Sequence, residues 1–346
     1  YKNNTWNTDN SSSPINTSIG LLHADKFKFK SGNDFSYTLS LNGENKYVVR
    51  RGVDRTFLQG AGVYDNNLYK EDYKYQTATS ALLALKYKHS RFDIVSNTFY
   101  LKSTESKIQD QLGYTNNQVS NPNIWIRLNQ FEQSDYLNTQ LFTTIKLTSS
   151  GYHTLKAGGS YVKTHFQQPD RKFIVGERLG NNLINTSYGG NHLNRQYLDV
   201  KGNYYTSALV EYQFKFKELD NGKFNKFALG YNMFRNNLNL TYRIFAGQRL
   251  YNVNYTAPIN NIDSYIVNDV NSGVLFFREE SNGDWKFKFD QFVNAGYANV
   301  FYNIGKNLEI NGGVRAEKSN REIKYRNVFD GITDPYRKLK QDKLYI

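Results

Sequence analysis

The chain contains no cysteine among its 346 residues, one methionine and five prolines. The absence of cysteine excludes disulfide bonds, thiolate metal sites and cysteine nucleophiles, and it fits a protein built for an oxidising compartment. A long hydrophobic run is also missing, since the longest purely aliphatic stretch is ALLAL, residues 81–85. A transmembrane helix needs about 18 apolar residues in a row, so we expect no helical membrane span.

Signals for catalysis and for metal binding are missing as well. The five histidines lie far apart in the sequence, and none has the spacing of a zinc site. No nucleophile elbow, phosphate-binding loop or calcium loop is present, and paired carboxylates such as Glu279 and Glu280 lie in segments predicted as loops. We therefore predict that the protein is not an enzyme and has no cofactor and no metal ion.

The charge balance is strongly basic, with 44 Lys and Arg against 31 Asp and Glu, a formal net charge of +13. Such a balance fits an anionic ligand, an anionic membrane surface or well-solvated loops. The basic residues are interspersed along strand-like segments such as KFKFK, and no continuous basic arm is present. We therefore expect no nucleic-acid partner.

Strand patterns dominate the chain, and helical apolar stripes are nearly absent. In residues 294–319, the segment NAGYANVFYNIGKNLEINGGVRAEKS, small and apolar residues alternate with polar ones, and the tight connection NIGKN separates the two arms. A period of two indicates strands with one apolar and one polar face. Aromatic residues make up 16% of the chain, and several are predicted to lie near strand ends: Tyr37, Tyr75, Tyr87, Tyr161, Tyr212 and Tyr302.

Short and long connections alternate along the predicted strands. Short connections are expected at 30–34, 88–91, 148–153, 217–225 and 303–307, and long loops at 43–72, 102–133, 164–200, 236–284 and 318–340. The predicted strands have about 10 to 16 residues, and a strand tilted in a bilayer needs about 9–11. The predicted fold is therefore an all-β, antiparallel, up-and-down transmembrane barrel with long extracellular loops.

About ten or eleven strands are expected in residues 1–346, which we interpret as a partial barrel domain without a plug domain or a signal peptide. An open sheet would leave unpaired edges in lipid, which favours a larger barrel completed by further strands. A large soluble β-sandwich or solenoid is the alternative fold. It does not explain the alternation of short and long connections, and no fixed short repeat is present.

Three stretches resemble one known family. The hairpin AGYANVFYNIGKNLEINGGVRAEKS, the strand GGSYVKTHFQQPDRKF with its Pro169-Asp170-Arg171 ending, and the final QDKLYI are similar in order and spacing to segments of TonB-dependent outer-membrane transporters. Ala316 departs from the pattern, because the family usually has an aromatic residue there. The similarity is scattered from about Trp6 to the end of the chain.

This resemblance implies a 22-stranded barrel in the outer membrane of a Gram-negative cell, plugged by a globular domain and energised through TonB. It implies uptake of a ferric siderophore, a cobalamin-like cofactor or an oligosaccharide. Implied partners are outer-membrane lipid and lipopolysaccharide, TonB through residues outside this chain, the ligand itself and a surface lipoprotein. A passive porin and an outer-membrane adhesin or assembly component remain as alternative functions.

Ligand contacts are predicted from aromatic and Arg residues in the predicted loops, because aromatic rings stack on sugars and flat chelates and Arg pairs with carboxylates. The candidates are Arg50, Arg51, Arg55, Trp125, Arg127, Tyr242, Arg249, Tyr251, Tyr255 and Tyr265. The alternative role of these residues is to pack on one another and hold long loops closed. Arg315 and Glu317, one strand step apart on a polar face, are predicted to form a charge pair on the lumen wall.

Overall fold

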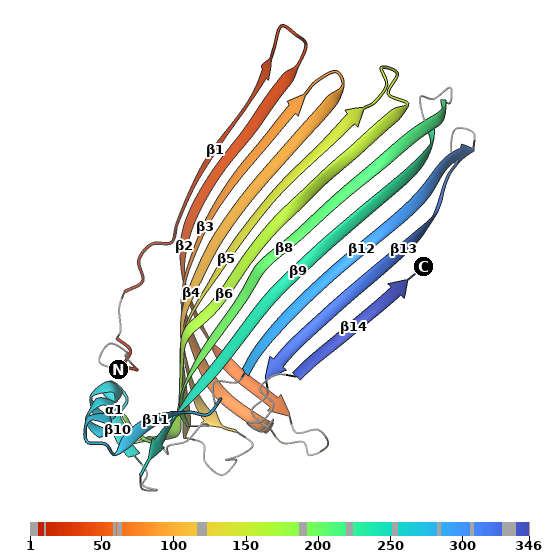
Figure 1. The fold of residues 1–346 in the computed structure, drawn as a ribbon. Helices are drawn as coiled ribbons and strands as arrows, with labels where there is room; N and C mark the ends of the chain where they lie inside the picture. Colours follow the sequence, from red (N-terminus) through yellow and green to blue (C-terminus); the bar gives the residue numbers. More distant parts are fainter. Residues whose placement is uncertain are drawn as a thin grey trace.

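The computed structural model of the chain describes residues 6–9, 12–57, 60, 64–115, 123–186, 192–218, 224–250, 255–281, 285–304, 308–326 and 337–345. These residues form one curved antiparallel sheet whose strands lie side by side in chain order (Figure 1). Its main path crosses β1 (Thr17–Lys28), β2 (Asp34–Phe57), β3 (Tyr64–Lys88), β4 (Phe92–Tyr114), β5 (Ile124–Lys146), β6 (His153–Leu179), β8 (Leu193–Glu218), β9 (Phe224–Arg249), β12 (Trp285–Ile304), β13 (Leu308–Arg326) and β14 (Arg337–Tyr345). The predicted antiparallel, up-and-down arrangement of about ten or eleven strands is confirmed.

Three short strands and one helix lie off this path. They are β7 (Leu183–Thr186), β10 (Tyr255–Pro258), α1 (Ile262–Asn271) and β11 (Leu275–Glu279). Strand β10 pairs with β7, and β11 pairs with β9. Within the described residues, β1 is hydrogen-bonded to β2 and β14 to β13, but β1 and β14 are not paired with each other. The sheet is therefore open at both edges.

Three of the predicted short connections are described, between β1 and β2, β3 and β4, and β5 and β6, and they lie at one end of the sheet, at the top of Figure 1. Residues 219–223 and 305–307 lie outside the described residues, and the strand ends on either side of them lie at this same end. We call this the short-turn end and the other the long-connection end. The prediction of long loops is wrong in its extent. Strand pairing runs on from Asn45 and Thr77 to Phe57 and Tyr64 in the β2–β3 hairpin, and the other main hairpins likewise pair deep into the predicted loops.

The sequence prediction missed this extension because charged residues occur on both faces of the hairpin arms there, as Arg50 and Arg51 do on β2. Several strands reach 23 to 27 residues, longer than the 10 to 16 predicted. Alternation of apolar and polar side chains marks a strand only where one face is buried or lies against an apolar medium. Backbone hydrogen bonding between neighbouring arms continues regardless of side chains, so the strand persists where the pattern has faded.

One face of the sheet carries a continuous uncharged surface, which we call the apolar face. Residues directly opposite each other on neighbouring strands share a face. One such row crosses ten strands without a charge: Phe27, Phe35, Tyr87, Ile94, Thr143, Ala157, Val210, Tyr231, Gly296 and Ala316. Large hydrophobic side chains on this face are exposed, with Leu141 at 55% and Val314 at 72%. The six tyrosines predicted near strand ends all lie on it.

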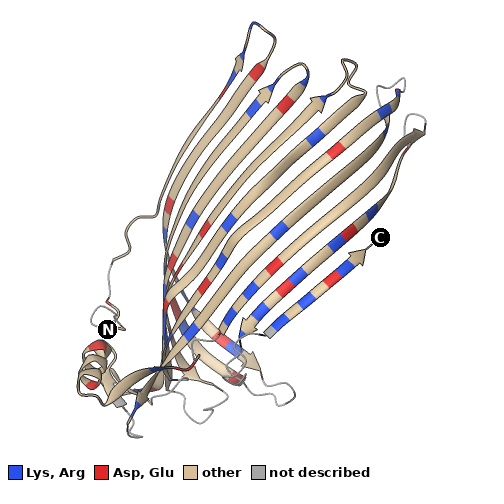
Figure 2. Ribbon diagram, viewed as in Figure 1, with Lys and Arg blue, Asp and Glu red and all other residues tan. Residues whose placement is uncertain are grey.

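The length of the uncharged surface differs between strands. Its first charged residue comes ten residues from the short-turn end on three strands: Lys102 after Phe92, Asp135 before Ile145 and Lys318 after Leu308. On β2 it comes later, at Arg51, and on β1 earlier, at Asp25. Aromatic rings lie near its edges, with Tyr87 and Phe92 5.8 Å apart at one and Tyr47 stacked on Tyr75 at 4.5 Å at the other. Figure 2 shows charged positions near the short turns and again over the lower part of the sheet, with fewer between them.

The opposite side, which we call the polar face, is hydrogen-bonded and closely packed. Tyr297 lies over Gly230 of β9 so closely that a Cβ there would come within 2.2 Å of its ring. Its hydroxyl donates a hydrogen bond of 2.7 Å to Glu211 on β8. Phe142 covers Gly158 in the same way. Glycine is required at both positions because the neighbouring ring occupies the space of a side chain.

A compact hydrophobic core lies at the long-connection end, beside α1. It contains Trp6, Trp125, Ile174, Ile184, Leu193, Ile262, Ile266 and Leu275. The backbone N–H groups of Trp6 and Asn7 donate to the carboxylate of Asp263 in the first turn of α1, at 2.5 and 3.0 Å. These contacts join residues about 256 positions apart in sequence and attach the start of the described chain to the helix.

Candidate ligand-binding surface on the polar face

Cationic side chains follow one row of the polar face between β3 and β6. Lys74 lies directly opposite Lys107, Lys107 opposite Gln130, and Gln130 opposite Arg171. We call these four residues the cationic row. Like charges directly opposite each other on neighbouring strands are destabilising unless other groups compensate them. The row is therefore either neutralised by neighbouring carboxylates or suited to hold an anion.

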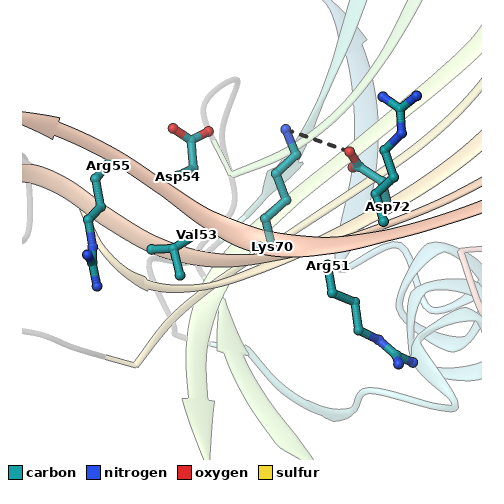
Figure 3. A pocket seen from close by; sticks show the side chains of 8 residues that line it. Arg51, Val53, Asp54, Arg55, Lys70 and Asp72 are labelled. Carbon is teal, nitrogen blue, oxygen red and sulfur yellow. Dashed lines mark ion pairs between the residues drawn. The ribbon is translucent and has the colours of Figure 1, made fainter.

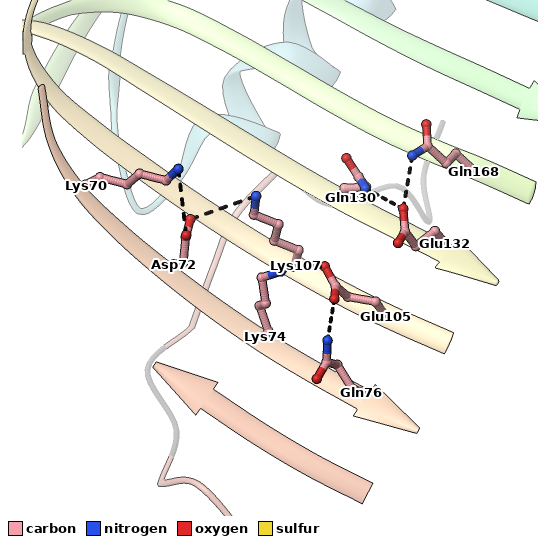
Figure 4. Close-up of polar contacts among 9 residues, drawn as sticks. All are labelled: Lys70, Asp72, Lys74, Gln76, Glu105, Lys107, Gln130, Glu132 and Gln168. Atoms are coloured by element: carbon pink, nitrogen blue, oxygen red, sulfur yellow. Dashed lines mark hydrogen bonds and ion pairs between the residues drawn. The ribbon is translucent and has the colours of Figure 1, made fainter. Parts of the chain in front are cut away.

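Carboxylates occupy the adjacent row, nearer the short-turn end. Glu105 and Glu132 lie directly opposite each other. Lys74 and Gln76 donate to Glu105 at 3.0 and 2.5 Å, and Gln130 and Gln168 donate to Glu132 at 2.8 and 3.0 Å. Figure 4 shows these contacts bridging four neighbouring strands. Both carboxylates are therefore satisfied, and Lys74 is the member of the cationic row that neutralises one of them.

Lys107 and Arg171 are the cations of the row that have the fewest close carboxylates or hydrogen-bond acceptors. The nearest carboxylate oxygen to Lys107 belongs to Asp72 at 3.9 Å, and Asp72 also faces Lys70 at 3.8 Å. Burial lowers the pKa of Lys107, and the nearby Lys74 and Lys70 lower it further, while Asp72 opposes the shift. Arg171 donates from Nη1 to Gln196 at 3.2 Å, but its buried Nε has no hydrogen-bond partner. The geometry therefore leaves donors available on both sides of Gln130.

Burial alone would raise the pKa of Glu105, but hydrogen bonds from Gln76 and Lys74 outweigh it and hold the pKa below its ordinary value. Glu105 is therefore ionised at neutral pH. An anion entering the cationic row would meet this fixed negative charge on one side, so we expect its binding to be weak and directional.

The three arginines of β2 that were predicted to contact a ligand do not lie on one face of the sheet. Arg50 lies on the polar face opposite Asp72, whereas Arg51 and Arg55 lie on the apolar face. Figure 3 shows Arg51, Val53 and Arg55 on the side of the strand pair opposite Lys70 and Asp72. Arg51 pairs with Glu71 at 2.9 Å, and Arg55 donates to Asn67 at 2.9 Å. A shallow pocket of about 360 Å³ is lined by residues 50–55 with Lys70 and Asp72, so its lining residues belong to both faces.

Trp125 and Arg127 are packed inside the protein. Trp125 is buried in the hydrophobic core. Arg127 is also buried, donates to both carboxylate oxygens of Asp110 at 2.7 and 2.6 Å, and stacks on the Trp125 ring at 4.9 Å. This arrangement agrees with the alternative role that the sequence left open, in which such residues hold the ends of the hairpins together.

Other predicted contacts are spread over the long-connection end. Tyr242 meets Trp285 edge-on at 5.7 Å, and Arg249 pairs with Asp269 of α1 at 2.8 Å. Tyr265 lies on α1 and is 40% exposed. Tyr255 begins β10, but its side chain and the whole of Tyr251 lie outside the described residues.

Arg315 and Glu317 do form an ion pair on the polar face, with Nη2 and Oε2 2.8 Å apart. Arg315 also donates to Asn232 at 3.3 Å. The charge pair predicted from their spacing is therefore present, and it ties β13 toward β9.

The residues of the cationic row were missed by the sequence prediction. A signal was present, because Lys70, Asp72, Lys74 and Gln76 recur at every second position from the end of the predicted loop 43–72 into the residues that follow it. A strand continued through this segment would have placed all four on one face. Which residues of β4 and β6 lie opposite them depends on the register of pairing, which the sequence alone leaves open.

No helix among the described residues is long and apolar enough to cross a membrane. In the part of the chain that the structure describes, no three His, Asp or Glu side chains come together in a way that could hold a metal ion. Comparison of the chain with models of known protein families and with curated proteins finds no match. The resemblance to TonB-dependent transporters therefore stays a prediction.

Proposed function

We propose that the sheet is part of a transmembrane β-barrel in an outer membrane and that the protein imports a scarce anionic ligand with energy supplied through TonB. One observation carries the proposal: an uncharged surface crosses ten strands on one face, while ion pairs and hydrogen-bonded polar groups occupy the other. Outer-membrane barrels have this division, with an apolar band toward lipid and a polar lumen.

The dimensions of the uncharged surface support the membrane assignment. Ten residues of strand at about 3.4 Å each, tilted by about 45°, span about 24 Å along the membrane normal. The apolar band of outer-membrane barrels is about 25 Å tall and is flanked by aromatic residues. Tyr47, Tyr75 and Tyr87 occupy the corresponding positions. A soluble sandwich would instead cover such a surface with a second sheet.

Closure of the sheet follows from the same physics. The open edges of β1 and β14 would leave unpaired backbone groups in lipid, where each costs several kcal/mol. We propose that further strands join these edges in a closed barrel, as the resemblance implies. The apolar face then meets lipid, the polar face lines the lumen, and the long-connection end lies outside the cell, where its hairpins and α1 form the mouth.

Import of an anionic ligand is supported by the cationic row. In this arrangement Lys107 and Arg171 offer donors within the lumen above the membrane level, and the Gln residues beside them can accept or donate. Contacts of this kind must be weak enough to release the ligand. A plug outside this chain would gate passage, and TonB would drive its movement. A passive porin would share the lumen but would need no energy.

The experiment that tests this function is uptake by cells that express the complete protein. Radiolabelled ferric citrate, cyanocobalamin and a maltooligosaccharide represent an anionic chelate, a cofactor and a neutral glycan. We expect ferric citrate to accumulate in cells with a working TonB system and to fall to the background level in a strain without TonB. Uptake that is unchanged without TonB would overturn active import and support the porin.

Removing the two opposed lysines should weaken capture of the anion. The double variant Lys74→Gln and Lys107→Gln is expected to raise the concentration of ferric citrate that gives half-maximal uptake by about tenfold, because charge-assisted hydrogen bonds are lost while the shape of the surface is kept. Lys30→Gln with Lys146→Gln, near the short turns, is the matched control and should leave uptake unchanged. Equal uptake by both double variants would exclude the cationic row from the path of the ligand.

A further inference from the structure

Strand β2 runs past the end of its neighbour β1. The last pair of these two strands is Thr17 with Asn45, and β2 continues to Phe57. Over residues 46–57, β3 is paired with one side of β2, but no strand among the described residues is paired with the other side. Figure 1 shows the chain before β1 leaving the sheet in the direction of α1. We call residues 48–57 of β2, on the side away from β3, the free edge.

The side chain of Asn16 shows which backbone groups face this side of β2. Its amide oxygen accepts a hydrogen bond of 2.6 Å from the N–H of Tyr47, and its amide nitrogen donates to the carbonyl of Tyr47 at 3.5 Å. A side-chain amide thus takes the place that a peptide group of a neighbouring strand would have. Backbone groups alternate in direction along a strand, so the odd-numbered residues 49–55 also present their N–H and C=O groups to the free edge.

The side chains along the free edge are accessible, and they alternate between apolar and basic. All residues from Val49 to Phe57 are exposed, and Val49 and Val53 are each 53% exposed. Figure 3 shows Val53 between Arg51 and Arg55. The pocket of about 360 Å³ along this edge is lined by four cationic side chains and two carboxylates. A strand added here would therefore meet apolar side chains and an excess of positive charge.

The two arginines of this row keep hydrogen-bond donors for a further partner. Arg51 pairs with Glu71 at 2.9 Å, but its side chain remains 61% exposed. Arg55 donates to the neutral side chain of Asn67 at 2.9 Å and lies over the Tyr64 ring at 5.2 Å. A guanidinium has five N–H donors, and its strongest hydrogen bonds are those to carboxylates. Acidic side chains are therefore the best partners opposite Arg51 and Arg55.

A second copy of this chain does not fit the free edge. In the membrane-spanning sheet proposed above, each strand is tilted by about 45°, so two copies related by a twofold axis along the membrane normal would cross their β2 strands at about 90°. Pairing of backbone groups requires strands that are closely aligned. The arginines of two copies would also repel each other.

We propose that the free edge of β2 binds an extended, acidic segment of another protein by β-strand addition. The segment would lie beside β2 and exchange backbone hydrogen bonds with residues 49–55. Its acidic side chains would lie opposite Arg51 and Arg55. Its apolar side chains would lie opposite Val49 and Val53. In this mode of recognition, backbone hydrogen bonds give affinity and alternate side chains give specificity. Binding here does not require import, because the free edge belongs to β2 and the cationic row begins on β3.

The test measures binding of a fluorescent peptide to the complete protein in detergent by anisotropy. The peptide, acetyl-Thr-Glu-Thr-Val-Thr-Glu-Glu-Val-Thr-amide, is designed to lie antiparallel to residues 48–56. Val53→Pro removes one N–H from the free edge and leaves the hydrogen bonds to β3 in place. We expect it to weaken binding about tenfold, the effect of one lost hydrogen bond. Val53→Ala keeps the N–H and is the matched control, with an expected change of less than about threefold.

Two altered peptides test the same contacts with the unaltered protein, so the result does not depend on the folding of a variant. Methylation of the backbone nitrogen of the peptide residue opposite Val53 removes the matching donor, and we expect binding about tenfold weaker. Replacement of each Glu of the peptide by Gln removes its charge, and we again expect binding at least about tenfold weaker.

Failure of the unaltered protein to bind the acidic peptide would overturn the inference, since the edge would then be covered by another part of the protein or closed to strands. Equal affinity for the acidic peptide and its Gln version would overturn the role of the arginines. Equal affinity for the acidic peptide and its methylated version would overturn strand addition, and so would equal binding by folded Val53→Pro and Val53→Ala. The heat-dependent gel mobility of folded barrels shows that both variants are folded.

Discussion

Replacing Leu141 by Arg is expected to lower the free energy of unfolding of the protein in phospholipid vesicles by about 2–4 kcal/mol. Leu141 lies on the apolar face of β5 and is 55% exposed. It is four residues from Ile145 and six from Asp135, the two ends of the uncharged stretch, and is therefore near its middle. An Arg there would place its charge near the centre of the bilayer, where water cannot solvate it. Denaturant-induced unfolding in vesicles measures the change.

The matched control is Gln140→Arg, one residue away on the same strand but on the polar face, opposite Asn97 and Ser160. An Arg at this position enters the polar lumen, so we expect a change of less than about 1 kcal/mol. Similar effects of the two substitutions would contradict the assignment of the faces. A soluble sheet with Leu141 in contact with water would tolerate Leu141→Arg, so the experiment also separates the membrane protein from a soluble alternative.

A loss of about 3 kcal/mol of stability is expected for Asp110→Ala. Asp110 accepts two hydrogen bonds from Arg127, at 2.7 and 2.6 Å, and the side chain of Arg127 is only 7% exposed. Removing the carboxylate leaves a buried guanidinium without its counter-charge, beside an Nη1 that already has no partner. Desolvation of that cation is then uncompensated. Thermal unfolding of the detergent-solubilised protein, followed by tryptophan fluorescence, would measure the loss.

Two further variants give this prediction its control. The double variant Asp110→Leu with Arg127→Leu removes both charges together, and we expect it to be more stable than Asp110→Ala because no buried charge remains. Lys26→Ala breaks an exposed pair with Asp34, in which the Lys26 side chain is 54% exposed, and should cost less than about 1 kcal/mol. If Asp110→Ala were no more damaging than Lys26→Ala, Arg127 would be available to a ligand after all.

The two-residue period was enough to predict the strands of the uncharged surface and their faces. In the 294–319 hairpin, Val300 and Val314 recur on one face and Asn299 and Arg315 on the other, as the structure has them. The short turns could also be predicted, because Gly, Asn, Asp and Ser gather between apolar runs at those places. These are local properties: side-chain direction along a strand and the chemistry of a tight turn depend on residues next to each other.

Prediction failed where residues distant in sequence determine the structure. The length of β2 and β3 depends on backbone pairing between them. Near Phe57 and Tyr64 neither arm has a regular alternation of apolar and polar residues, so the sequence does not indicate that the strands extend this far. Trp125 and Arg127 looked like loop residues open to a ligand, yet they are buried because Trp6 and α1 cover the ends of the strands. The burial of Trp125 and Arg127 therefore could not be predicted from the segment NIWIRLNQF alone.

The sequence by itself determined an antiparallel, strand-built chain with one apolar and one polar face, because alternation and turn residues act within a few positions of each other. Only the tertiary structure decided that Lys107 stands between Lys74 and Arg171, and that Lys324 stands between Lys288 and Lys338. Neighbours across strands follow from the pairing register and from bulges such as the one between Gln168 and Arg171. A shift of one residue would move every side chain of a strand to the other face, so both clusters of charge exist only in the register that the folded sheet adopts.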